Sequence, residues 1–286
     1  MQSITAIVLT KNEELNIRRC LDSIIEHVER IVIVDSGSTD KTLQIAEELG
    51  AEIKYNPFQY YAQQFNWGID NADITTEWIL RIDADEVFPE KLWQELDVIF
   101  EKNDPEVCGI TIEANLYFLG KHIKHGFRKK RKMMLFKTNC GRIEDRRRDA
   151  QSILTKGRSV TVKERFEHYD FKSLDQYIKR CNWYATREMM DYVDYKQGIM
   201  ETEINTDAAI RNQRAKKFGI YYKAPMFLRA HLWFIWNYYF KLGFLDGKEG
   251  KIFWFLECYW YRFVVDAKIY EQEKFNTEKE ELKAID

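Results

Sequence analysis

Residues 78–86 of the chain read Trp78-Ile79-Leu80-Arg81-Ile82-Asp83-Ala84-Asp85-Glu86. The first five residues of this stretch are mainly apolar, which is typical of a buried strand, and two aspartates then follow at positions i and i+2. At the carboxyl end of a strand in an open α/β sheet, side chains project into the cleft where ligands bind. Asp83 and Asp85 offer the oxygen ligands with which Mg²⁺ binds between carboxylates and substrate phosphates. A merely solvated acidic turn has the same pattern, so this stretch alone leaves both interpretations open.

Length and composition limit the class of protein. The 286 residues suit one large domain, or a domain with a substantial addition, and can bury a proper core. The formal net charge of −2 gives no overall field that favours nucleic acid. Five scattered cysteines without a C-x-x-C pair are typical of reduced thiols. We see no secretory leader and no apolar segment of about 18 residues, and we therefore expect a cytoplasmic protein.

Strands and helices are expected to alternate along the first part of the chain. Apolar residues recur at helical spacing in residues 15–24 and 43–49. Short apolar or β-branched runs predict strands at residues 4–9, 31–34, 53–55, 78–82, 109–113 and 133–137. This order predicts right-handed βαβ units, and hence an α/β fold with a mainly parallel sheet flanked by helices.

Polar residues gather where the expected strands end. Residues 10–14 follow the first strand, residues 35–40 follow the second, and residues 83–86 follow the fourth, while Asn66 lies in a helix between them. Helix capping accounts for each cluster taken alone. Their common position at one edge of a parallel sheet favours a ligand site.

The C-terminal part of the chain differs in composition. Residues 226–240 and 252–265 are dense in aromatic side chains and are separated by a glycine-containing loop, which predicts a helical hairpin. Packing on the first domain, a dimer contact and in-plane contact with a membrane all stay open for this hairpin. We expect one domain over residues 1–170 and a helical region over residues 171–286.

A basic tract occupies residues 121–148. A solvated face is one interpretation. The other is an anionic partner, either substrate phosphates or the head groups of an anionic membrane surface. Nucleic acid is not expected, because no recognised binding module accompanies the tract.

These motifs resemble those of the inverting family 2 glycosyltransferases with the GT-A fold. Residues 8–14, 34–40 and 80–86 match three family motifs in order and spacing. Further matches narrow the resemblance to bacterial enzymes that assemble colanic-acid-type exopolysaccharide and lipopolysaccharide cores; they lie at residues 64–67, 243–247, 260–262 and 265–268. The resemblance implies a hexosyltransferase that moves a sugar from a nucleotide-diphosphate sugar, with a UDP-sugar expected, to a glycan acceptor. It further implies a lipid-linked acceptor and a peripheral position on the inner face of the cytoplasmic membrane.

The resemblance also implies roles for single residues. Asp35 would face the uracil or ribose, Asp83 would approach the ribose and the metal, and Asp85 would coordinate the Mg²⁺ or Mn²⁺ that bridges the diphosphate. Such an ion stabilises the negative charge that develops on the leaving nucleotide. The full set implied to bind the nucleotide sugar is Thr10, Asn12, Glu13, Asp35, Asn66 and Asp83.

A general base must take a proton from the acceptor hydroxyl as it attacks the anomeric carbon. In related sequences this base lies in an Asp-Glu-His-like patch, and Asp149 holds the base position here. Ala150 and Gln151 replace the acidic residue and the histidine of the patch. Asp145 and Glu144 therefore stay open as alternative bases, as do an altered acceptor and reduced activity.

Two other functions also stay open. A sugar nucleotidyltransferase has a GT-A-like sheet, but residues 10–14 lack the glycines that usually follow the first strand in that class. A catalytically altered nucleotide-sugar-binding or scaffold protein would explain the replaced patch around Asp149.

Overall fold

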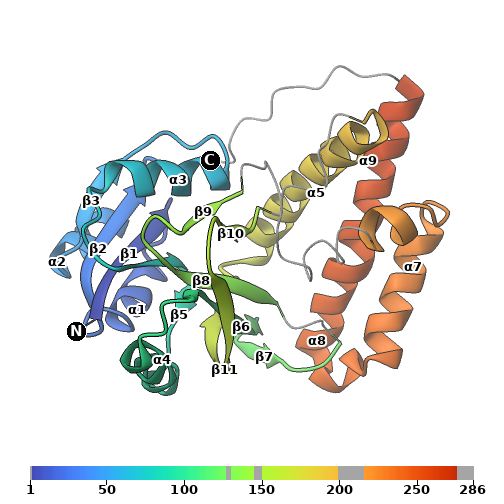
Figure 1. Cartoon of the computed structure of the whole chain (residues 1–286). Coiled ribbons are helices and arrows are strands. Elements are labelled where there is room, and N and C mark those ends of the chain that lie inside the picture. Colours follow the sequence, from blue (N-terminus) through green and yellow to red (C-terminus); the bar gives the residue numbers. More distant parts are fainter. Residues whose placement is uncertain (1, 127–129, 145–149, 199–215, 276–286) are drawn as a thin grey trace. The chain divides into compact units, whose positions relative to one another are not determined.

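The computed structural model describes residues 2–126, 130–144, 150–198 and 216–275 (Figure 1). By its internal contacts the chain divides into two compact units. Unit 1 comprises Met1–Tyr117 and Lys129–Asp170, and unit 2 comprises Phe118–Arg128 and Phe171–Asp286. The assignment of separate functions to residues 1–170 and 171–286 stays a prediction.

Unit 1 is built on a mixed, mainly parallel sheet. Its strands run in the order β3-β2-β1-β4-β8-β6-β11-β5. Their bounds are β1 (Gln2–Thr10), β2 (Val28–Asp35), β3 (Glu52–Tyr55), β4 (Trp78–Asp83), β5 (Glu86–Val87), β6 (Val107–Phe118), β8 (Arg131–Lys137) and β11 (Arg158–His168). The four strands from β3 to β4 are parallel, and β8 is antiparallel to both β4 and β6. The predicted α/β class is confirmed.

The register of the parallel strands places their polar ends side by side. Thr10 of β1 lies opposite Asp35 of β2, and Leu9 lies opposite Asp83 of β4. Neighbouring strands are about 5 Å apart, so the loops that follow β2, β1 and β4 form one continuous edge.

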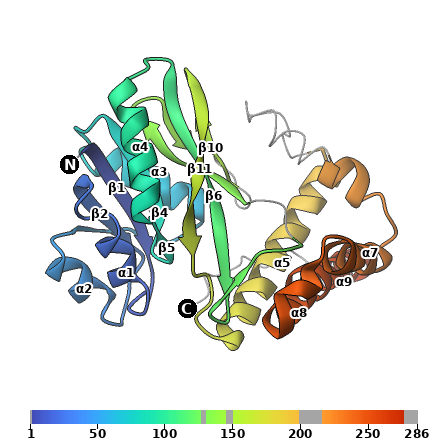
Figure 2. The same ribbon diagram turned by 90° about the horizontal axis from the view of Figure 1, so that it is seen from below.

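Helices cover both faces of this sheet, as Figure 1 shows for α3 and α4. The helices are α1 (Ile17–Asp22), α2 (Thr42–Glu48), α3 (Tyr61–Asn71) and α4 (Glu90–Lys102). Val8 belongs to the core formed with α1, α2 and α4, whereas the adjacent Ile7 belongs to the core formed with α3. Seen from below in Figure 2, α1 and α4 lie on the near side of the sheet. Burial on both faces explains the nearly continuous apolar runs of the parallel strands.

A small hairpin completes unit 1. It consists of β9 (Gly141–Ile143) and β10 (Ser152–Leu154), which pair antiparallel as a separate two-stranded sheet. Asp145 and Asp149, which the sequence offers as bases, lie between these strands and outside the described residues.

Unit 2 is mainly helical. Its elements are β7 (Lys121–Ile123), α5 (Leu174–Lys196), η1 (Lys217–Tyr221), α7 (Leu228–Ile235), η2 (Trp236–Phe240), η3 (Gly243–Asp246), α8 (Gly247–Trp254), η4 (Phe255–Trp260) and α9 (Tyr261–Phe275). Helix α7 packs against η4, and α5 packs against α9. The predicted helical C-terminal region is confirmed. Within the described parts of the chain, no helix is both long and apolar enough to cross a bilayer.

A buried ion pair ties the two arms of this hairpin together. Arg229 of α7 donates from Nε to Asp266 Oδ1 of α9 at 2.8 Å, and both side chains are almost fully buried. The other oxygen of Asp266 accepts from the backbone N–H of Phe227 at 2.7 Å. A charge buried in this way is tolerated only while its partner is present.

We expect Asp266→Ala to lower the free energy of unfolding by about 3–5 kcal/mol, because it leaves the Arg229 guanidinium buried without a counter-ion. Urea unfolding followed by tryptophan fluorescence measures the change. Glu271→Ala, an exposed carboxylate on the same helix, is the matched control. Equal midpoints for the two variants would contradict the structural role of the pair.

Candidate functional site

The loops that follow β1 and β2 are locked together by the carboxylate of Asp35. Thr10 donates from Oγ1 to Asp35 Oδ1 at 2.9 Å. Asp35 Oδ2 accepts from the backbone N–H groups of Gly37 and Ser38 at 2.7 and 2.8 Å. Asp35 is 1% exposed, so its buried carboxylate holds the two loops in place through these hydrogen bonds. Its contact with a uracil or ribose stays a prediction.

A second set of bonds joins the same loops closer to the surface. Asn12 adopts a left-handed φ of 54° and accepts from the backbone N–H of Thr39 through Oδ1 at 2.8 Å. The backbone N–H of Glu13 donates to Thr42 Oγ1 at 2.7 Å. The structure thus gathers Thr10, Asn12 and Glu13 at one edge of the sheet, as the sequence predicts.

At the end of β4, Asp83 is held by two neighbours. Tyr61 Oη donates to Asp83 Oδ1 at 2.8 Å, and Lys132 Nζ donates to Asp83 Oδ2 at 2.7 Å. Lys132 Nζ also lies 2.9 Å from each carboxylate oxygen of Glu86. Burial opposes ionisation of Asp83, but the charges of Lys132 and Arg81 outweigh it and lower the pKa of Asp83. Asp83 is therefore a fixed, ionised carboxylate.

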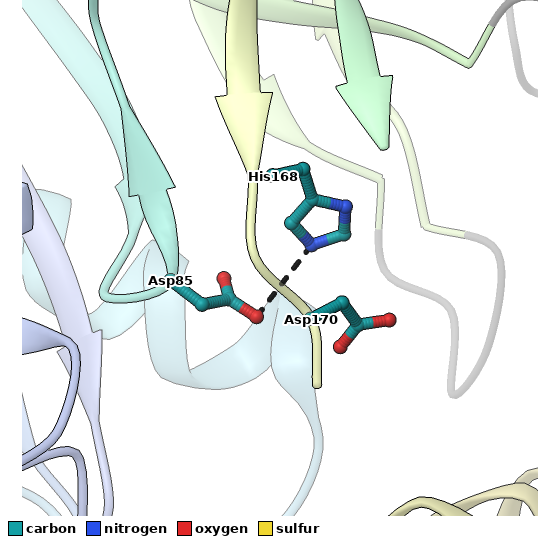
Figure 3. Close-up of side chains that lie close together, drawn as sticks. All are labelled: Asp85, His168 and Asp170. Atoms are coloured by element: carbon teal, nitrogen blue, oxygen red, sulfur yellow. Dashed lines mark ion pairs between the residues drawn. The ribbon is translucent and has the colours of Figure 1, made fainter. Parts of the chain in front are cut away.

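Three other side chains form a group that could hold a metal ion: Asp85, His168 and Asp170. One donor atom from each lies within 4.8 Å of the others, and His168 Nε2 is 3.5 Å from Asp85 Oδ2 (Figure 3). His168 is buried, whereas the two aspartates are partly exposed.

Strand pairing brings this group together. The short strand β5 runs antiparallel to the end of β11, with Glu86 opposite His168. The backbone N–H of Tyr169 donates to the carbonyl oxygen of Asp85 at 2.9 Å. The turn that carries Asp85 is thereby fixed against the segment that carries His168 and Asp170.

The charges around His168 favour a cation at this position. Burial and the nearby Lys130 would lower the pKa of His168, but the carboxylates of Asp85 and Asp170 outweigh them and raise it. A bound divalent ion would pair with the same two carboxylates. It requires Nε2 of His168 in the unprotonated form.

The geometry fits an octahedral divalent ion. Ligands at about 2.1 Å from such an ion stand about 3 Å apart when adjacent and about 4.2 Å apart when opposite. The 3.5 Å between His168 and Asp85 suits adjacent ligands after a small contraction. One imidazole and two carboxylates suit Mn²⁺ better than Mg²⁺, which prefers oxygen ligands throughout. About three positions stay open for phosphate oxygens or water.

The sequence reasoning missed His168 and Asp170. A signal was present, since Val160, Val162 and Phe166 alternate with polar residues before His168, as in a half-buried strand. A histidine and an aspartate at the end of such a strand follow the rule that drew attention to Asp83 and Asp85.

Asn66 has a structural contact that the sequence did not predict. Its Nδ2 donates to the carbonyl oxygen of Ile143 at 2.8 Å, and its Oδ1 accepts from the backbone N–H of Ile143 at 3.0 Å. Arg142 also forms two bonds with Asp70, at 2.9 and 2.7 Å. Strand β9 is therefore fastened to α3, and a donor-binding role for Asn66 stays a prediction.

Some basic residues of the tract at 121–148 form ion pairs within the folded protein. Arg131 pairs with Glu113 at 2.9 Å, and Lys132 forms the network described above. Residues 127–129 and 145–149 lie outside the described parts of the chain.

The chain matches the model of the family described as "Glycosyl transferase family 2" over residues 5–155. An uncharacterized glycosyltransferase of Rickettsia felis is 28% identical over 223 residues, which cover 72% of this chain and 76% of that protein. The lipopolysaccharide core biosynthesis glycosyltransferase LpsC of Rhizobium meliloti is 25% identical over 279 residues, which cover 94% of this chain and 92% of LpsC.

A solved structure with a similar region is glucosyl-3-phosphoglycerate synthase of Mycobacterium tuberculosis, in complex with Mn²⁺, UDP and glucosyl-3-phosphoglycerate. The TM-score is 0.33 at 21% identity. The match covers 41% of this chain and 44% of that chain, less than half of either.

We expect Lys132→Met to lower the free energy of unfolding by about 3–5 kcal/mol, because Asp83 and Glu86 lose the cation that lies between them. Adding Glu86→Gln should restore at least about 1 kcal/mol, since one unpaired buried charge is then removed. Urea unfolding of the single and double variants measures both effects. Lys163→Met, an exposed lysine on β11, is the control. A double variant less stable than Lys132→Met would contradict the pairing.

Proposed function

The chain belongs to glycosyl transferase family 2, and we propose that it is a metal-dependent, inverting enzyme that uses a nucleotide-diphosphate sugar, with UDP as the expected nucleotide. The family match confirms the resemblance seen in the sequence, the GT-A class and the glycosyltransferase activity. The observation that carries the finer proposal is the group of Asp85, His168 and Asp170 at the edge of the sheet.

The position of this group supports a diphosphate ligand. It adjoins the end of β4, and the loops after β1 and β2 continue the same edge. We assign these loops, with Thr10, Asn12, Glu13 and Asp35, to the nucleotide. Asp85 would hold a divalent ion on the phosphate side of these loops, and such an ion would supply Lewis-acid stabilisation of the charge on the leaving group.

The chain's own residues have separate tasks in this mechanism. Asp85, His168 and Asp170 would hold the ion. Lys130 is exposed and lies 3.4 Å from His168 Nδ1, from where its side chain can turn toward a phosphate. Asp83 is held by Tyr61 and Lys132, so it can accept a hydrogen bond from a ribose hydroxyl without rearrangement. Preorganised groups of this kind avoid a reorganisation cost during reaction.

The acceptor side needs a base. As the acceptor oxygen bonds to the anomeric carbon, the bond from that carbon to the diphosphate oxygen breaks and the hydroxyl proton passes to a carboxylate. Attack from the face opposite the diphosphate inverts the configuration. We keep Asp149 as this carboxylate, with Asp145 and Glu144 as alternatives. Glu144 is 3% exposed, so its carboxylate is buried.

We further propose a lipid-linked glycan acceptor in lipopolysaccharide core or exopolysaccharide synthesis, and a cytoplasmic enzyme peripheral on the inner face of the membrane. The similarity to LpsC, named for lipopolysaccharide core biosynthesis, extends over 94% of this chain and supports the acceptor class.

We expect Asp85→Asn and His168→Gln each to lower kcat/KM for UDP-sugar turnover by about a hundredfold or more, because each removes a ligand of the ion that stabilises the leaving group. UDP release is measured with Mn²⁺ and with EDTA. Asp73→Asn, an exposed aspartate on a left-handed turn, serves as the control. Undiminished turnover in EDTA would contradict the metal-dependent mechanism.

We expect Asp149→Asn to lower kcat by about 10²–10⁴-fold while the Kd for UDP with Mn²⁺ stays unchanged, because the base acts only on the acceptor. Asp145→Asn and Glu144→Gln are made beside it. If Asp149→Asn transfers sugar at the wild-type rate and either Asp145→Asn or Glu144→Gln loses transfer, the residue whose variant lost transfer is the base. Donor binding without transfer to any acceptor would favour a scaffold protein.

A further inference from the structure

One side of the continuous helix α7–η2 exposes a stripe of large apolar residues. They recur at spacings of four, three and one residues, which places them on one helical face. Each is between 41% and 69% exposed; they are Leu228, Leu232, Ile235, Trp236, Tyr239 and Phe240. We call these six residues the apolar face.

Further large apolar side chains are exposed elsewhere in the hairpin. In the connection to α8, Leu242, Phe244 and Leu245 are 43–54% exposed. On the facing arm, Phe255 and Phe263 are 45% and 36% exposed. Both of these rings contact Tyr259, with centroids 5.4 and 5.8 Å away, and Tyr259 contacts Phe234 of α7. Exposed patches of this extent on a protein surface mark interaction sites.

The exposed charged side chains around the apolar face are lysines. Residues 227–245 contain no aspartate or glutamate. Lys241, Lys248 and Lys251 are exposed around the connection between the two arms. Arg229 is buried and paired with Asp266, and the half-buried Glu249 pairs with Lys121 at 3.2 Å. Glu257 on the facing arm is half-buried and accepts from Tyr177 Oη at 3.0 Å, so the fully exposed charges of residues 227–260 are positive.

We propose that unit 2 docks in the plane of an anionic lipid bilayer through the apolar face, with Lys241, Lys248 and Lys251 on the head groups. Helices that lie in a membrane interface combine a tryptophan- and leucine-containing face with basic residues. Tryptophan and tyrosine favour the level of the head groups, and lysines near the surface are attracted to anionic lipid.

Charge complementarity favours lipid over a second copy of the chain. A twofold dimer through the apolar face would place the same patch of both copies together, and its lysines would meet with no acidic residue from residues 227–245 to offset them. Anionic head groups offset the same charges. Because apolar contact is not screened by salt, binding should outlast high salt in part, unlike the release expected for purely electrostatic docking.

The functional reason for membrane docking rests on the proposed lipid-linked acceptor. The binding test itself needs neither donor nor acceptor. The full-length protein is sedimented with vesicles of 30% phosphatidylglycerol in phosphatidylcholine and with vesicles of phosphatidylcholine alone. We expect binding to the anionic vesicles. Trp236→Ser/Phe240→Ser should lower the partition coefficient at least tenfold, because it removes two large side chains of the apolar face.

The control is Val98→Ser/Ile220→Ser, whose side chains are 48% and 69% exposed, close to the 49% and 69% of Trp236 and Phe240. It should bind like the wild type. Urea unfolding confirms that both double variants fold, and binding of UDP with Mn²⁺ reports on the proposed catalytic site separately. The proposal is overturned if the wild-type protein does not bind anionic vesicles or if the two double variants bind them equally. It is also overturned if the wild-type protein is a dimer that the Trp236→Ser/Phe240→Ser substitutions dissociate.

Discussion

The pairing of the two-residue strand β5 with the end of β11 is the contact on which the site depends. It joins a turn at residue 85 to a strand end more than eighty residues later, and it sets Asp85 beside His168 and Asp170. Neither segment forms a metal group by itself. Because β11 also pairs with β6 in the main sheet, the position of His168 is set by the core of unit 1 rather than by a loop. Sites built on such elements hold their geometry well.

The carboxylates around this turn have different partners. Lys132 lies between Asp83 and Glu86 and donates hydrogen bonds to both from inside the protein. Asp85 lies on the outer side of the same turn and is partly exposed. Two aspartates spaced i and i+2 thus have different surroundings, one fixed by protein groups and one directed at the histidine (Figure 3). We propose Asp85 of this Asp-x-Asp pattern as a metal ligand, whereas Tyr61 and Lys132 hold the carboxylate of Asp83 in place.

The sequence predicted those parts of the structure that depend on local pattern. The runs at residues 4–9, 31–34 and 78–82 are the cores of β1, β2 and β4, because strands buried on both faces must be apolar throughout. His168 was missed although β11 shows an alternating pattern, because its partner strand β5 has only two residues and leaves no signal in the sequence. Asn66 was taken only as a donor contact because its bonds to Ile143 span 77 positions of sequence. Long-range contacts of this kind have no local signature.

We propose that Asp85, His168 and Asp170 together hold the ion that binds the diphosphate. Anomalous X-ray diffraction from crystals grown with Mn²⁺ and UDP can locate this ion. We expect one manganese peak within bonding distance of all three side chains and of the diphosphate oxygens. A manganese ion bound through Asp83, with His168 and Asp170 left out, would refute the proposed site.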